Sequence, residues 1–313
     1  MDVYASLGTG VIGASWTSLF LAHGHPVRAY DPADGAEERL NAYIDTAWPV
    51  MEDLGLTENG ARDALTFHGS AAEAVDGAVF TQESVPERLP IKHATYAEIE
   101  EAQGADAILS SSASGLTLSQ MQGGWKDPSR IVLGHPFNPP HLVPLVEVMA
   151  NEATAPGVLE RTEAIYAALG KVTIRVRKEI PGHVANRLQA ALWREAISMV
   201  ADGVTTVEDI DKAIWAGPGV RWAAMGPNML WHLAAGPGGL AAYMDHFADS
   251  FHGWWDNMGD PRLDDATRKL LYEGVLAEAA GRGQDELAAE RDALVMAVLK
   301  ATQKIRADLS DAT

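Results

Sequence analysis

Short apolar runs alternate with amphipathic stretches over the first half of the chain. Residues 3–7 form a mostly apolar run that predicts a buried strand. Residues 14–23 carry Trp16 and Phe20 at helical spacing, and residues 27–30 predict a second strand. A strand, a helix and another strand within about thirty residues are typical of one β-α-β unit of a parallel sheet.

The same alternation continues toward the middle of the chain. Further short strands are predicted at residues 79–81, 107–109, 131–134 and 143–149, with a helical pattern over residues 90–102. Alternating strands and helices indicate a doubly wound, largely parallel sheet of the Rossmann type.

Beyond residue 181 the pattern changes to helices alone. Residues 183–202 have helical periodicity, and Gly203 is suited to end that helix. Helical patterns broken by Gly-Pro loops continue to Thr313, with no convincing strand. We therefore predict an α/β fold with a Rossmann-type domain over residues 1–181 and an all-helical domain over residues 182–313.

The composition fits a globular protein and narrows its environment. Of the 313 residues, 47% are hydrophobic and none is cysteine, which excludes disulfides, thiolate metal ligands and a cysteine nucleophile. The 43 acidic and 24 basic residues give a formal charge of −19, which disfavours nucleic acid and anionic membranes as partners. No basic segment precedes the first apolar run, and no run of about eighteen apolar residues occurs. We expect a cytoplasmic protein with neither a metal site nor a membrane span.

A complete G-x-G-x-x-G motif follows the first predicted strand. It consists of Gly8, Thr9, Gly10, Val11, Ile12 and Gly13. The first glycine permits a tight turn, the second lets the backbone approach a pyrophosphate, and the third lets helix and strand pack closely. Asp31, at the end of the second strand, is placed to accept hydrogen bonds from the ribose hydroxyls of adenosine and disfavours a 2′-phosphate. The motif therefore predicts a site for NAD rather than NADP.

Two later segments carry candidate chemistry at predicted strand ends. One is serine-rich and covers residues 110–115; the other is Gly-His-Pro-Phe-Asn-Pro-Pro at residues 134–140. If the strands before and after the second segment are neighbours, His135 and Glu147 lie side by side. A carboxylate on one imidazole nitrogen fixes the tautomer, as a general base requires.

Five motifs, in order over almost the whole chain, resemble the 3-hydroxyacyl-CoA dehydrogenase superfamily. They are the glycine motif with Asp31, the serine-rich strand end, the His-Pro-Phe-Asn-Pro loop, the Leu-Val-Glu strand and Pro-Gly-His-Val-Ala-Asn-Arg-Leu. The resemblance implies that His135 takes the hydroxyl proton while hydride leaves for the nicotinamide, and that Glu147 stabilises the imidazolium.

The same resemblance assigns four more residues. It implies that Ser114 and Asn186 hold the reacting oxygen, since both side chains can donate a hydrogen bond. It also implies that Glu87 and Lys92 approach the nicotinamide half of the cofactor. From the residues alone, the alternatives are a Glu87 that starts a helix and a solvated Lys92.

The sequence departs from the acyl-CoA members of this family where CoA binding needs basic residues. A CoA nucleotide carries several phosphate charges, yet no lysine precedes Lys92, and residues 33–66 contain only Arg39 and Arg62. Acyl-CoA members carry basic residues in that stretch. We therefore expect a small free hydroxy acid as the substrate.

The loop at residues 217–227 resembles the Gly-Leu-Arg-Trp loop of L-carnitine dehydrogenases and, more loosely, L-gulonate 3-dehydrogenase and lambda-crystallin. Arg221 is predicted to bind a substrate carboxylate through two hydrogen bonds. Trp222, Trp231 and Tyr243 are predicted to hold a quaternary ammonium against aromatic faces. The alternatives are an Arg221 stacked at a domain or subunit seam, and aromatic residues that belong to the core or to a dimer interface.

Together these features favour NAD-dependent oxidation of the 3-hydroxyl of a small free acid, first of all L-carnitine to 3-dehydrocarnitine. The alternatives are L-gulonate, a 3-hydroxybutyrate-type acid, a 3-hydroxyacyl-CoA, or a non-catalytic crystallin-like role. The resemblance also implies a homodimer, for which the apolar helix faces around Leu270 and Leu294 are candidates. Ala113 and Pro90 depart from related sequences, which often have Ser or Thr and an acidic residue there.

Overall fold

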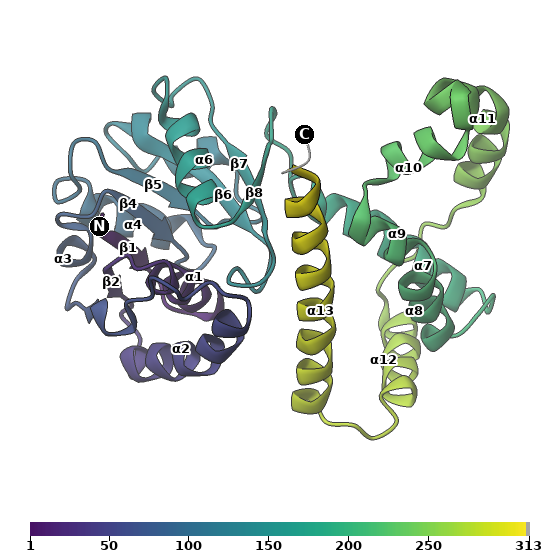
Figure 1. Cartoon of the computed structure of the whole chain (residues 1–313), viewed down its shortest axis with the longest axis horizontal. Helices are drawn as coiled ribbons and strands as arrows, with labels where there is room; N and C mark the ends of the chain where they lie inside the picture. The colour runs from purple at the N-terminus through teal and green to yellow at the C-terminus, as the bar shows by residue number, and fades with distance from the viewer. Residues whose placement is uncertain (311–313) are drawn as a thin grey trace. The chain divides into compact units, whose positions relative to one another are not determined.

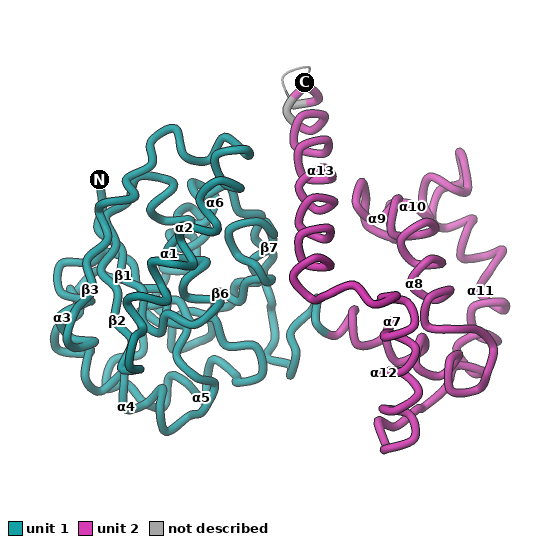
Figure 2. Tube along the Cα trace, turned by 90° about the horizontal axis from the view of Figure 1, so that it is seen from below, with its two compact units in different colours: residues 1–186 teal, residues 187–313 magenta. Residues whose placement is uncertain are grey.

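The computed structural model describes residues 1–310 and divides the chain into two compact units, Met1–Asn186 and Arg187–Thr313 (Figure 1, Figure 2). The division lies a few residues after the boundary predicted at residue 181. The first unit contains an eight-stranded sheet with helices, and the second consists of helices. We call them the α/β unit and the helical unit.

The sheet of the α/β unit has the strand order β3-β2-β1-β4-β5-β6-β7-β8. Neighbouring strands are parallel except for β6 and β7, which are antiparallel because the short segment 137–144 joins them directly. The strands are β1 (Tyr4–Leu7), β2 (Val27–Tyr30), β3 (Leu65–Phe67), β4 (Phe80–Glu83), β5 (Ile108–Ser111), β6 (Ile131–Pro136), β7 (Leu145–Met149) and β8 (Val172–Arg175). This sheet, with the helical unit that follows it, has the predicted fold class.

Helices cover both faces of the sheet. Side chains from α1, α2 and α6 share one buried cluster with the sheet, and side chains from α3, α4 and α5 share another. The helices are α1 (Val11–Ala22), α2 (Ala36–Asp53), α3 (Ala71–Val75), α4 (Leu89–Ile99), α5 (Leu118–Gln122) and α6 (Val158–Ala168), with 3-10 turns at Arg62–Ala64 and Pro128–Arg130. The sheet therefore has two apolar faces, as a doubly wound fold requires.

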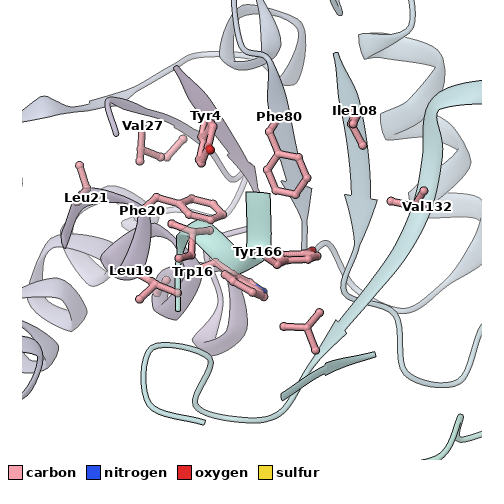
Figure 3. Close-up of a cluster of buried hydrophobic side chains, with 14 of the residues drawn as sticks. Tyr4, Trp16, Leu19, Phe20, Leu21, Val27, Phe80, Ile108, Val132 and Tyr166 are labelled. Carbon is pink, nitrogen blue, oxygen red and sulfur yellow. The ribbon is translucent and has the colours of Figure 1, made fainter. Parts of the chain in front are cut away.

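Aromatic side chains fill the cluster beneath α1 (Figure 3). Trp16 stacks on Phe20 with ring centroids 5.6 Å apart, and Phe80 meets Tyr166 edge-on at 5.7 Å. These rings are fully buried, and large buried side chains of this kind dominate core energetics. They fix α1 and α6 against the strands whose carboxyl ends carry the candidate site.

Two strands and one helix boundary differ from the sequence-based prediction. The short strands β3 and β8 were not predicted, because neither has the fully buried, apolar character of the central strands. The helix predicted over residues 183–202 is α7, which begins at Ala185 and ends at Ala201. His183 lies outside it because its φ is +48°, a left-handed value that a right-handed helix cannot contain.

The helical unit buries few of its apolar side chains. Its helices are α7 (Ala185–Ala201), which starts in the α/β unit, α8 (Val207–Ala216), α9 (Pro218–Ala224), α10 (Pro227–Ala234), α11 (Gly239–Asn257), α12 (Asp265–Ala279) and α13 (Gln284–Ser310), with a 3-10 turn at Gly236–Gly238. Its buried cluster consists of Ala196, Val200 and Ile210, while Trp254 and Trp255 are 56% and 58% exposed. Within residues 1–310, no helix has the length and apolar character needed to span a membrane.

Candidate active site

The glycine loop between β1 and α1 has the backbone that the motif predicts. Gly8 has a φ of +80°, and a Cβ atom there would lie 2.7 Å from the backbone of Ser84. A Cβ atom at Gly13 would lie 1.8 Å from the carbonyl oxygen of Gly8. A side chain at either position would therefore clash with the loop itself.

Gly10 differs, because a Cβ atom there would point into open space. It precedes the first turn of α1 and makes no side-chain capping bond, while Val11 and Ile12 begin the helix. The N-terminal N–H groups of a helix attract anions, and the missing side chain leaves room for a pyrophosphate to approach. These features fit the diphosphate of NAD.

Asp31, directly after β2, is held beside this loop. The N–H of Thr9 donates to Oδ2 of Asp31 at 2.7 Å, and the N–H of Ala33 donates to Oδ1 at 2.9 Å. Oδ2 also accepts from the hydroxyl of Thr9 at 3.4 Å, so Oδ1 is the oxygen that can accept a further hydrogen bond from a ribose hydroxyl. The residues present therefore fit the adenosine half of NAD as well as its diphosphate.

His135 and Glu147 face each other across the antiparallel pair of β6 and β7. They occupy directly opposite positions in the register, and Nδ1 of His135 lies 2.8 Å from Oε2 of Glu147. Both side chains are buried. The structure thus brings together the two residues that the sequence predicts as neighbours.

Glu147 also binds the start of α7. The N–H groups of Val184 and Ala185 donate to its Oε1 at 2.8 and 3.0 Å. Burial alone would raise the pKa of Glu147, but the hydrogen bonds from His135, Ala185 and Val184 together lower it below its usual value. An ionised carboxylate only accepts hydrogen bonds, so Nδ1 of His135 carries the proton and Nε2 keeps a lone pair. This arrangement can take a proton at Nε2.

His183 is a neighbour of this pair to which the sequence analysis assigns no role. Its side chain is 2% exposed, and its ring centroid lies 5.1 Å from that of His135. Its Nε2 donates to the carbonyl oxygen of Ala113 at 3.2 Å. Burial lowers its pKa, so a neutral imidazole packs against His135. The available signal was its place within the Pro-Gly-His-Val-Ala-Asn motif.

Ser114 is held by Glu87. The hydroxyl of Ser114 donates to Oε2 of Glu87 at 2.8 Å, and the N–H groups of Ser114, Gly115 and Leu116 all donate to Oε1. Burial would raise the pKa of Glu87, but these hydrogen bonds lower it overall. In this structure ionised Glu87 therefore takes the single hydroxyl proton of Ser114, which has to turn away from Glu87 to donate to the reacting oxygen as predicted.

Lys92 is buried, so the alternative of a solvated lysine is wrong. Its side chain is 1% exposed, and its ammonium donates to both carboxylate oxygens of Glu83 at 2.6 and 2.8 Å. Ser111 and Tyr96 donate to the same carboxylate at 2.7 Å each. A charged lysine can be buried only with such partners, so in this structure it contacts Glu83 rather than a surface open to the nicotinamide.

Asn186 is the second residue of α7 and is half-buried. It follows directly after Val184 and Ala185, whose N–H groups bind Glu147. The start of α7 therefore carries Asn186 and also holds the carboxylate that contacts His135. Within residues 1–310 its side chain makes no hydrogen bond, which leaves its amide able to donate to a ligand oxygen.

Three of the four predicted substrate residues meet in the helical unit. Trp231 of α10 stacks on Tyr243 of α11 with ring centroids 4.8 Å apart, and the guanidinium of Arg221 lies 5.9 Å from the Trp231 ring. Trp222 is 42% exposed and shares no ring contact with other residues of the described chain. The structure therefore shows a stacked group of Arg221, Trp231 and Tyr243, with Trp222 outside it.

Comparison with known proteins agrees with the fold and the motifs. The NAD-binding domain of 3-hydroxyacyl-CoA dehydrogenase matches residues 4–180, and the C-terminal domain of the same family matches residues 182–283. The chain is 46% identical to L-carnitine dehydrogenase from Streptomyces griseus, over 96% of this chain and 90% of that protein. It is also 46% identical to L-carnitine dehydrogenase from Streptomyces coelicolor, over 96% and 95%.

A solved structure resembles the whole chain. The crystal structure of 5-formyl-3-hydroxy-2-methylpyridine 4-carboxylic acid 5-dehydrogenase, an NAD-dependent dismutase, has a TM-score of 0.82 and 28% identity. The match covers 97% of this chain and 99% of that one. With a glycine loop that fits NAD and a paired histidine and glutamate at the sheet edge, the chain belongs to the 3-hydroxyacyl-CoA dehydrogenase family.

Proposed function

We propose that this protein is an NAD-dependent dehydrogenase that oxidises the 3-hydroxyl of L-carnitine to a ketone. The observation that carries the reaction is the buried contact between Nδ1 of His135 and Glu147, which leaves Nε2 as a base. The choice of substrate is supported by the 46% identity to two proteins named L-carnitine dehydrogenase.

The proposed mechanism assigns each step to a side chain. Nε2 of His135 accepts the proton of the 3-hydroxyl, and Glu147 stabilises the resulting imidazolium through Nδ1. Asn186 donates to the substrate oxygen as it becomes a carbonyl, and Ser114 joins it once its hydroxyl proton turns from Glu87 to the substrate. The glycine loop and Asp31 would hold NAD, which would supply the hydride acceptor for C3. In the reverse direction His135 returns its proton to the same oxygen.

A free acid suits this chain better than a CoA thioester. No lysine that could neutralise CoA phosphates precedes Lys92, and the chain carries a charge of −19. The two named relatives and the dismutase are named for substrates that carry a carboxylate. L-gulonate and 3-hydroxybutyrate are the other free acids that the same chemistry could oxidise.

Contacts in the helical unit support separate roles for Arg221 and Trp222. Trp231 already packs against Tyr243 and Arg221, so it is better placed to hold the guanidinium than to hold a ligand cation. We therefore propose Arg221 as the partner of the substrate carboxylate, supported by Trp231 and Tyr243. The exposed face of Trp222 is the remaining candidate for the trimethylammonium group.

The test is NADH formation with L-carnitine, D-carnitine, L-gulonate, 3-hydroxybutyrate and 3-hydroxybutyryl-CoA side by side. We expect the highest kcat/KM for L-carnitine. A higher kcat/KM for L-gulonate or 3-hydroxybutyrate would agree with the proposed mechanism but contradict the proposed cation site. Activity on the thioester alone would contradict the argument from missing basic residues.

A variant separates the cation site from general packing. Trp222→Leu should raise the KM for L-carnitine by about two- to thirtyfold, because a cation–π contact contributes about 0.5–2 kcal/mol. The KM for 3-hydroxybutyrate, which has no cation, should stay unchanged. Trp193→Leu is the matched control, since Trp193 is also an exposed tryptophan of the helical unit.

We further propose that the enzyme acts in the cytoplasm as a homodimer formed through the helical unit. The exposed apolar side chains of that unit support association with a second copy. Light scattering of the purified protein measures the oligomeric state directly, and a monomer at micromolar concentration would contradict it.

A further inference from the structure

A chain of hydrogen-bonded side chains crosses the sheet beside the catalytic strand. We call it the Gln82 chain. Its members are, in order, Ser110, Tyr166, Gln82, Ser112 and Ser84. The donor-to-acceptor distances between successive members are 2.7, 2.7, 2.8 and 2.9 Å. Tyr166, Gln82 and Ser110 are fully buried, whereas Ser112 and Ser84 are half-buried.

The backbone fixes the orientation of Gln82. Its Nε2 lies 3.4 Å from the carbonyl oxygen of Gly134, the residue before His135, and a carbonyl oxygen only accepts. The NH2 group of Gln82 must therefore face Gly134 and Ser112, and its Oε1 must face Tyr166. Gly134 has to be glycine here, because a Cβ atom would lie 2.1 Å from the hydroxyl oxygens of both Ser110 and Tyr166.

This orientation sets the direction of every other bond in the Gln82 chain. Oε1 of Gln82 only accepts, so the single hydroxyl proton of Tyr166 is committed to it, and Ser110 must donate to Tyr166. At the other end Ser112 accepts from Nε2 of Gln82. Ser112 and Ser84 then have two hydroxyl protons between them but only one shared hydrogen bond.

One hydroxyl proton of this pair is therefore left over. Within residues 1–310 it has no further acceptor, because the hydrogen bonds of these two side chains end with each other and with Gln82. Both side chains are half-buried and lie at the end of the Gln82 chain, so the remaining proton is available to a bound ligand.

The pair lies beside the glycine loop. The N–H of Ser84 donates to the carbonyl oxygen of Leu7 at 2.7 Å, and a Cβ atom at Gly8 would lie 2.7 Å from the carbonyl group of Ser84. Ser84 and Ser112 directly follow the neighbouring strands β4 and β5. Dinucleotides bind at the carboxyl ends of such strands, and NAD offers phosphate and carboxamide oxygens as acceptors.

We propose that the Ser84–Ser112 hydroxyl pair is a cofactor-binding element that donates one hydrogen bond to an oxygen of NAD. The Gln82 chain holds this donor in place and ties it to the backbone of the strand that carries His135. This role is separate from the choice of substrate, because it concerns the cofactor alone.

The test measures the Kd of NAD by calorimetry without any substrate, so it is independent of the proposed activity on L-carnitine. Ser84→Ala and Ser112→Ala should each raise the Kd by about three- to tenfold, because one substitution removes the donor to NAD and the other removes the hydroxyl that orients it. In the double variant the Kd of NAD should be close to that of the weaker-binding single variant. The two effects should not multiply, because the two hydroxyls act as one donor. Ser84→Thr, which keeps a hydroxyl, should restore binding.

ADP-ribose separates the two possible acceptors. If the serine variants also weaken ADP-ribose, the acceptor is a phosphate oxygen; if they weaken NAD alone, it is the carboxamide oxygen. Ser18→Ala is the matched control, because the buried Ser18 hydroxyl donates only to the carbonyl oxygen of Ala14 within α1. A Kd for NAD that is unchanged in Ser84→Ala, Ser112→Ala and the double variant, all folded by circular dichroism, overturns the proposal.

Discussion

In the α/β unit Trp16 and Phe80 are fully buried, whereas in the helical unit Trp254 and Trp255 are more than half exposed. The α/β unit packs its apolar side chains into two large clusters, one on each face of the sheet, and a small third cluster of Ala22, Ala47 and Met51. The helical unit has one small cluster built on Ala196, Val200 and Ile210. A unit that leaves so much apolar surface exposed needs a partner to cover it, and we propose a second copy of the chain.

The difference also separates two kinds of function. The α/β unit holds the glycine loop, Asp31 and the His135–Glu147 pair, so the proposed chemistry and cofactor binding depend on a core that this unit completes by itself. The helical unit carries the stacked group of Arg221, Trp231 and Tyr243. Substitutions at the site of the α/β unit should alter catalysis without altering association. Substitutions of exposed apolar residues in the helical unit should alter association without altering catalysis.

The largest expected effect comes from removing the base in the α/β unit. His135→Ala should lower kcat by about 10²–10⁴-fold, because general base catalysis contributes that much. NAD affinity and oligomeric state should match the wild type. Stopped-flow kinetics and NAD titration test this, and a large loss of NAD affinity in His135→Ala would contradict the assignment of this residue to proton transfer.

The next effect concerns association. Val275→Asp places a carboxylate on the exposed apolar face of α12 and should raise the dimer Kd by about a hundredfold, since each copy loses about 1.5 kcal/mol of apolar burial. Sedimentation velocity over a range of concentrations measures it. Val172→Asp is the control, because Val172 of the α/β unit is 52% exposed and Val275 is 51% exposed. Equal effects of both substitutions would remove the contrast between the units.

A smaller effect is expected at the adenosine end of the cofactor site. Asp31→Asn should raise the Kd of NAD by about tenfold, because a hydrogen bond to a charged group contributes about 1.5–3 kcal/mol and an amide oxygen replaces only part of it. Fluorescence titration with NAD measures the change. Asp34→Asn, three residues further along and exposed, should bind NAD like the wild type.

A separate effect, on stability rather than on turnover or binding, is a pH dependence of unfolding in the α/β unit. Lys171 is buried, donates to the carbonyl oxygens of Pro140 and Val143, and has its pKa lowered by burial from 10.5 to about 7. Between these values the unfolded chain binds a proton that the folded chain does not, so the free energy of unfolding gains a contribution that rises with pH.

Urea unfolding at several pH values between 7 and 10 tests this contribution. Lys171→Met should remove it, so that the free energy of unfolding of the variant rises less with pH than that of the wild type. Lys126→Met is the control, since Lys126 is exposed. The same pH dependence in both variants and the wild type would show that Lys171 keeps its proton on folding.

The sequence could predict those site residues whose position is set by backbone close to them in the sequence. The glycine loop and Asp31 belong to one β-α-β unit, and their spacing is set by that unit. His135 and Glu147 were predictable because a short connection makes their two strands neighbours. The family resemblance, confirmed by the family models, extended the prediction to the whole chain.

The features that sequence reasoning missed depend on contacts between distant segments. The Gln82 chain joins β4, β5 and α6, and no local pattern reveals that Tyr166 lies beneath Gln82. The buried ion pair of Lys92 with Glu83 was not predicted, because Glu83 is on another element and faces Lys92 only after folding. The left-handed backbone of His183 follows from the turn that presents the next two N–H groups to Glu147.

Glu147 serves both as the partner of the catalytic imidazole and as the acceptor for the first N–H groups of α7. Fraying of that first helical turn would remove two donors from the carboxylate while the sheet stays folded. Enzymatic activity would then depend on this turn. Activity should decline at a lower urea concentration than the far-ultraviolet circular dichroism signal of the whole chain. The active site is thus sensitive to local melting at the junction between the two units.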